Sequence, residues 1–117
     1  NVLLSLGPRF AVVCLDAIDD VDERAALIES LQETGRDLVA ITLDELHAFC
    51  GNVLALESAS GDPVLAMSER ARAAFLPAHR ARLEEPASLV AADLSTIETY
   101  GGGSARCMLA EVFVPSR

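Results

Sequence analysis

The chain has 117 residues, of which 51% are hydrophobic, which is the size and composition of a globular domain rather than of a disordered segment. Nine basic residues against eighteen acidic ones give a formal net charge of -9, which would repel phosphate backbones and anionic lipid surfaces, so neither nucleic acid nor a membrane is expected as a partner. No apolar run approaches the roughly 20 residues that cross a bilayer, and we expect a soluble, cytoplasmic protein.

The first half of the chain predicts a hairpin, a helix and a third strand. The turn pair Gly7-Pro8 separates two apolar runs, and Gly35 ends a stripe of apolar residues with helical spacing. In chain order, we expect strands at 2–6 and 9–15, a helix from 21 to 34, a strand at 38–43 and a short helical turn at 44–48.

The second half predicts the same order of elements. Gly61 lies in a hairpin turn, and Pro77 suits the first turn of a helix. We expect strands at 52–57 and 63–67, helices at 69–76 and 77–84, a strand at 89–92, a short turn at 95–100 and a β-like apolar segment at 105–114.

An internal repeat supports this organisation. When the chain is shifted by 51 residues, residues 1–3 fall on residues 52–54 with the same sequence, and Leu38-Val39-Ala40 falls on Leu89-Val90-Ala91. A period near 50 residues is typical of modular and propeller-like proteins. The repeats would cover about residues 1–50 and 52–101, with a third unit beginning within 104–117.

Three cysteines are present, at positions 14, 50 and 107. Their odd number and wide spacing, without a CxxC motif or paired histidines, support neither a disulfide framework nor a zinc site. Cys14 lies inside an apolar run and Cys50 before an expected strand, so both are expected to be structural.

Cys107 differs because three glycines, Gly101-Gly102-Gly103, come shortly before it. Glycines let the backbone approach a ligand closely, and the following segment would then hold a reactive thiol in one place. The alternative is a turn before a buried cysteine that packs as a small hydrophobic residue.

The amino-acid sequence of segment 101–113 resembles the C-terminal signature of the arginine deiminase and amidinotransferase superfamily. The likeness is closest to the citrulline-utilisation hydrolase and dimethylarginine dimethylaminohydrolase-like branch of that superfamily. Segments 1–7, 10–15, 49–54 and 66–71 also look like this family, in family order. The resemblance implies an α/β propeller (pentein) built of ββαβ modules. The whole chain, 1–117, looks like the C-terminal portion of one such catalytic domain, namely its last two modules and the closing strand.

The resemblance also implies a cysteine-dependent hydrolase that acts on a guanidino or ureido carbon of arginine, citrulline or a related compound. Cys107 matches the family nucleophile, which forms a covalent intermediate and releases ammonia or an amine without a metal or other cofactor. Asn1 matches the third position of the family's His-x-Asn or His-x-Asp motif, so the catalytic histidine would lie two residues before it. The carboxylates that grip the guanidinium belong mostly to earlier modules.

The resemblance also bears on the partners of the chain and on alternative functions. We expect the missing N-terminal modules to be the partner, with homo-oligomerisation as a further option, and the isolated chain to be inactive. The alternatives are amidino transfer, and a non-catalytic propeller-fold binding protein of the ribosome anti-association type.

Other polar residues near the signature receive weaker assignments. Asn1, Gly102, Gly103 and Asn52 are candidates for substrate binding or for support of the site, although a structural role is favoured for Asn52. Packing or an ion pair is favoured over activation of the thiol for Arg106. His47 is the better candidate base of the two histidines, but it matches no catalytic position of the family. Surface positions are favoured for His79, Glu98 and Glu111.

Overall fold

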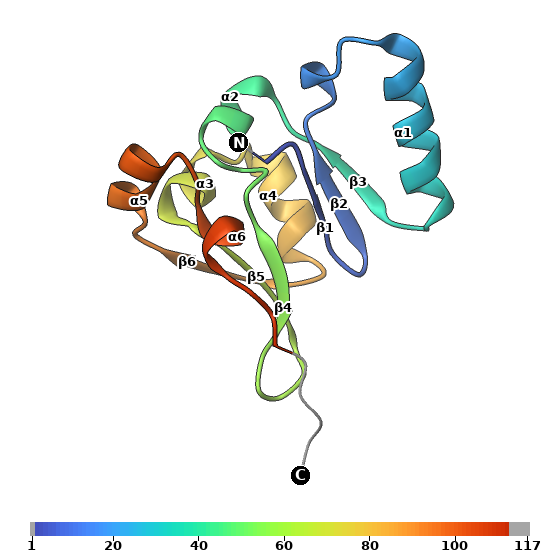
Figure 1. Ribbon diagram of the computed structural model, residues 1–117. Coiled ribbons are helices and arrows are strands. Elements are labelled where there is room, and N and C mark those ends of the chain that lie inside the picture. The colour runs from blue at the N-terminus through green and yellow to red at the C-terminus, as the bar shows by residue number, and fades with distance from the viewer. Residues whose placement is uncertain (1, 113–117) are drawn as a thin grey trace.

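The computed structural model describes residues 2–112, which form two three-stranded sheets with short helices around them (Figure 1). The mixed α/β class is therefore confirmed. Arrangement of the units as a propeller, and the division of the chain at 1–50 and 52–101, stay predictions.

The first sheet has the order β1-β2-β3, with β1 (Leu4–Leu6), β2 (Phe10–Val13) and β3 (Asp37–Ala40). The strands β1 and β2 are antiparallel across a tight turn, whereas β2 and β3 are parallel. A parallel pair needs a long crossover, and the short helix η1 (Leu15–Ala17) and the helix α1 (Val21–Glu33) provide it.

The turn between β1 and β2 requires a glycine. A Cβ atom on Gly7 would lie 2.5 Å from the ring of Phe10, which is buried. All four residues of β2 are buried, so the central strand is continuously apolar rather than alternating.

The second sheet repeats this arrangement, with β4 (Leu54–Glu57), β5 (Pro63–Ser68) and β6 (Ser88–Ala92) in the order β4-β5-β6. Again the first pair of strands is antiparallel and the second parallel. The crossover consists of α3 (Glu69–Ala74) and α4 (Pro77–Glu84), and α2 (Leu43–His47) joins the two sheets.

One hydrophobic core holds the two sheets together. Its buried side chains come from β2 and β3, from α2 and the turn after it, and from β5, α3 and α4. They are Phe10, Val12, Cys14, Val39, Ile41, Leu46, Cys50, Val53, Leu65, Met67, Ala71, Phe75 and Leu83. A smaller cluster of Ala11, Val13 and Leu31 lies between the first sheet and α1.

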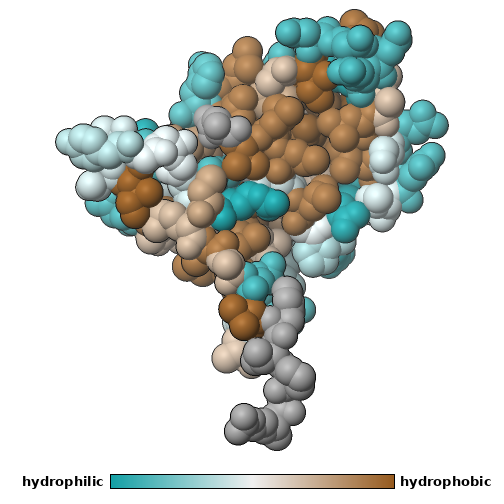
Figure 2. Space-filling view, in the orientation of Figure 1, coloured by the Kyte–Doolittle hydropathy of each residue, from teal (hydrophilic) through white to brown (hydrophobic). Residues whose placement is uncertain are grey.

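Much of the molecular face over β1–β3 is apolar in Figure 2, with polar side chains of α1 beside it. Leu6 at the end of β1 is 46% exposed. Within residues 2–112, none of the helices is both long and apolar enough to cross a bilayer.

Two element predictions near the end of the chain are wrong. Residues 95–100 form most of a helix, α5 (Ser95–Gly101), instead of a short turn, and the β-like segment opens with a helix, α6 (Ala105–Met108). The backbone N–H groups of Arg106 and Cys107 donate to Asn52 rather than to a neighbouring strand. Apolar content alone does not distinguish a strand from a helical turn held in this way.

Candidate active site

Cys107 lies in α6 with its side chain exposed, beside the start of β4. Asn52 contacts it twice. The Asn52 Nδ2 atom donates to Cys107 Sγ at 3.1 Å, and the Cys107 backbone N–H donates to Asn52 Oδ1 at 3.2 Å. Because the backbone N–H can only donate, Oδ1 must face it, and the amide nitrogen is thereby turned towards sulfur.

Asn52 is itself completely buried and follows a tight turn at the end of α2. Phe49 in this turn has a positive φ of 67°, a conformation that bulky residues seldom adopt. A Cβ atom on Gly51 would lie 2.1 Å from the carbonyl oxygen of Val2, and the Gly51 carbonyl accepts a hydrogen bond from Ser5 Oγ at 2.6 Å. The turn therefore has little freedom, and Asn52 is held in one place.

The glycine run supports Cys107 from the other side. Gly102 has φ 70° and ends α5, which explains a glycine there. A Cβ atom on Gly103 would lie 3.1 Å from Cys107 Cβ and 3.3 Å from Cys107 Sγ. Gly103 therefore contributes the space in which the thiol sits, whereas Gly102 contributes a backbone conformation.

These surroundings favour the thiolate form of Cys107. The hydrogen bond from Asn52 lowers the pKa of the Cys107 thiol, a backbone hydrogen bond from Ser104 lowers it further, and the charge of Arg106 adds a smaller effect in the same direction. The effect of Arg106 is the smallest of these on the pKa, and Arg106 forms no ion pair within the described residues, so the expected ion pair is absent there.

The other two cysteines are buried, unlike Cys107, which agrees with the structural roles predicted for them. Cys14 and Cys50 are completely buried in the core. Burial, followed by the nearby charge of Glu45, raises the pKa of the Cys50 thiol to about 12, so this cysteine stays protonated at neutral pH.

Glu98, which the sequence suggested was a surface charge, is buried instead. Its Oε2 atom accepts a hydrogen bond from Ser104 Oγ at 2.7 Å, and its Oε1 atom lies 3.8 Å from Arg70 Nε. Sequence reasoning missed Ser104 and Arg70 altogether. Serine is a preferred residue before a helix, but the Ser104 side chain does not cap α6 and donates to Glu98 instead, so no local signal predicts this contact.

Neither histidine is hydrogen-bonded to Cys107 in the part of the chain that is described. His47 is exposed in α2. The prediction of a solvated surface position for His79 is wrong, because its Nδ1 atom lies 2.8 Å from Glu45 Oε1. Asn1 lies outside the described residues, so its predicted role is not tested.

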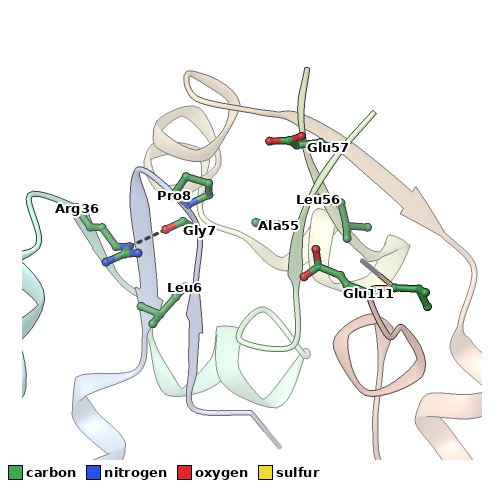
Figure 3. Close-up of a pocket in the computed structure, with 9 residues that line it drawn as sticks. Leu6, Gly7, Pro8, Arg36, Ala55, Leu56, Glu57 and Glu111 are labelled. Carbon is green, nitrogen blue, oxygen red and sulfur yellow. Dashed lines mark hydrogen bonds between the residues drawn. The ribbon is translucent and has the colours of Figure 1, made fainter. Parts of the chain in front are cut away.

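A separate pocket of about 650 Å³ lies between β1 and β4 (Figure 3). Its wall combines apolar side chains with charged ones, and Arg36 is fixed there by a 2.7 Å hydrogen bond to the Gly7 carbonyl. The carboxylate of Glu111 points into the pocket from the segment after α6. Cys107 is not among the residues that line this pocket. Among residues 2–112, no group of three or more side chains is arranged to hold a metal ion.

The model of one protein family, described as N,N dimethylarginine dimethylhydrolase, eukaryotic, matches residues 1–114. The chain therefore belongs to this family, as the resemblance predicted. Membership supports a dimethylarginine hydrolase-type function, with hydrolysis of a guanidino C–N bond. No curated protein and no solved structure matches the chain.

Proposed function

We propose that this chain carries the nucleophile of a cysteine-dependent hydrolase that acts on the guanidinium carbon of N,N-dimethylarginine or a close relative of it. The observation that carries the proposal is the exposed Cys107 thiol, held by Asn52 through two hydrogen bonds and with a lowered pKa. A thiolate is the form that attacks carbon.

In the proposed reaction, Cys107 Sγ forms a bond to the guanidinium carbon. The C–N bond to the dimethylamino group then breaks, and dimethylamine leaves after it takes up a proton. The resulting thiouronium adduct is attacked by water at the same carbon, the C–S bond breaks, and a ureido product and the free thiolate remain. Each proton transfer needs an acid or a base within hydrogen-bonding reach.

Since no described histidine contacts Cys107, we propose that this base lies outside residues 2–112. The family resemblance suggests a histidine two residues before Asn1. We also propose that further modules of the same protein supply the carboxylates that bind the substrate cation. A second copy of the chain is the other candidate source of these groups.

The test is to measure dimethylamine and ureido product from N,N-dimethylarginine with the whole protein, its Cys107→Ser variant and a Cys14→Ala variant. We expect Cys107→Ser to abolish turnover, while Cys14→Ala retains it because Cys14 is buried in the core. Unchanged turnover in Cys107→Ser would overturn the assignment of the nucleophile. Substrate binding by the wild-type protein without any turnover would instead favour the non-catalytic alternative.

A further inference from the structure

Glu98 is a buried acidic residue that the proposed chemistry does not use. Its side chain is 1% exposed, and no hydrogen bond to Oε1 is present in the described part of the chain. A buried charge is costly unless it is paired, and Arg70 at 3.8 Å supplies the partner for Glu98 Oε1. The other oxygen, Oε2, accepts the hydrogen bond from Ser104 Oγ.

Ser104 connects Glu98 to the thiol. It directly precedes α6 and is completely buried, and its backbone hydrogen bond is one of the two that favour the thiolate of Cys107. A shift of Ser104 would therefore move the first residues of α6 relative to Asn52. Glu98 fixes the position of Ser104 through this buried hydrogen bond, whose 2.7 Å length is well formed for two oxygen atoms.

Arg70 connects Glu98 to the turn that leads to Asn52, the residue that donates to the thiol. The Arg70 guanidinium lies over the ring of Phe49, with Cζ 5.8 Å from the ring centroid. Phe49 has the positive φ in the turn that leads to Asn52. The same arginine thus contacts the turn that carries Asn52 and the carboxylate that holds Ser104.

We propose that Glu98 is a positioning residue for Cys107, acting through Ser104 on one side and through Arg70 and Phe49 on the other. Together these contacts set the distance between α6 and Asn52. The inference rests on the proposed function only in taking Cys107 as the nucleophile.

The experiment measures the rate of alkylation of Cys107 by iodoacetamide against pH, with peptide mapping to separate it from Cys14 and Cys50. The variants are Glu98→Leu, Glu98→Gln, Ser104→Ala and Arg70→Gln. Arg82→Gln is the matched control, because Arg82 and Arg70 are similarly exposed, at 41% and 47%, and Arg82 pairs with Asp37 and Leu38 instead.

In Glu98→Leu, we expect the pH midpoint of alkylation to rise by about one unit, which is a tenfold loss of rate at pH values below the midpoint. Glu98→Gln keeps an acceptor for Ser104 Oγ and should shift less than Glu98→Leu. Ser104→Ala and Arg70→Gln should shift in the same direction as Glu98→Leu. Arg82→Gln should match the wild-type protein.

A folded Glu98→Leu variant with the wild-type midpoint would overturn the proposal. If Glu98→Leu does not fold, wild-type midpoints in both Ser104→Ala and Arg70→Gln would overturn it equally. A purely structural role for Glu98 would lower the unfolding temperature without moving the midpoint. Failure of the proposed function is a separate result, because it would be seen as turnover that survives Cys107→Ser.

Discussion

At the scale of single residues, the contact between Asn52 and Cys107 sets the chemistry of the thiol. Asn52 donates to sulfur through Nδ2 and accepts from the Cys107 backbone through Oδ1. Its donor stabilises the charged form of the thiol, and its acceptor fixes where that form lies. We therefore expect a side chain of similar size that lacks the donor to lose this stabilisation of the thiolate.

We expect the pH midpoint of Cys107 alkylation to rise in Asn52→Leu and to rise further in Asn52→Asp. Leucine removes both the donor to sulfur and the acceptor for the Cys107 backbone, whereas aspartate keeps the acceptor but replaces the donor with a negative charge beside the thiolate. Because the folded-state pKa of Cys107 is lowered, each variant should react more slowly at pH values below the wild-type midpoint and approach the wild-type rate above its own midpoint. A wild-type curve for Asn52→Asp would contradict this role.

Gly103 provides a second test of how the thiol is held. We expect Gly103→Ala to slow both alkylation of Cys107 and turnover, because the new Cβ would crowd Cys107 Cβ and Sγ. Gly101→Ala is the matched control in the same run, since its Cβ would meet only Ile97 at an ordinary 3.8 Å and its φ is not positive. Equal rates in the two variants would show that space at position 103 is unimportant.

At the scale of elements, the buried acid Glu45 ties α2 to α4. It completes a capping box with Thr42, accepts from the Leu76 backbone N–H and pairs with His79. Burial alone would raise the pKa of Glu45, but hydrogen bonds from Thr42, His79 and Leu76 outweigh it and hold the pKa below its usual value.

A lowered folded-state pKa means that Glu45 stabilises the fold at pH values above its ordinary 4.5 and that this contribution is lost as the pH falls through the folded-state value. We expect Glu45→Gln to cost about 1–3 kcal/mol of unfolding free energy at neutral pH, and the gap to the wild-type protein to narrow on acidification. Urea unfolding at a series of pH values measures both effects. The exposed Glu29→Gln is the control, and a gap that stays constant with pH would contradict the account.

The elements also show what could be predicted from the sequence. The two hairpins, α1 and the paired helices α3 and α4 follow turn residues, helix caps and periodicity, which are local signals. The helix around Cys107 does not follow from local signals, because the Cys107 backbone N–H donates to Asn52, which lies 55 residues away in the sequence. Cys107 was recognisable from the glycine run and the family signature. Burial of Glu98 and its contacts with Ser104 and Arg70 arise only when α3, α5 and α6 are folded together.

At the scale of the whole molecule, the two sheets share one core. Core side chains from β2 and β3 belong to the same cluster as those from β5, α3 and α4. Domains with a single core unfold cooperatively in most cases, so neither sheet is expected to persist without the other. The framework that holds Cys107 and Asn52 therefore depends on residues from both sheets.

We expect Leu65→Ala, in the completely buried middle of β5, to lower the unfolding free energy by about 2–5 kcal/mol. The loss should appear equally in amide exchange of β2 and of β5, because both strands contribute to one cluster. Exposed Leu76 is the control position, where the same substitution should have a much smaller effect. Selective loss of protection in β5 would show that the sheets unfold independently.

Trapping the covalent intermediate shows directly whether Cys107 is the nucleophile. The whole protein is mixed with N,N-dimethylarginine, quenched in acid during turnover and examined by intact mass and peptide mapping. We predict a covalent adduct on the peptide that contains Cys107, absent from Cys107→Ser and reduced in Asn52→Leu. Turnover without any adduct on Cys107, and at an undiminished rate in Cys107→Ser, would show that Cys107 is not the nucleophile.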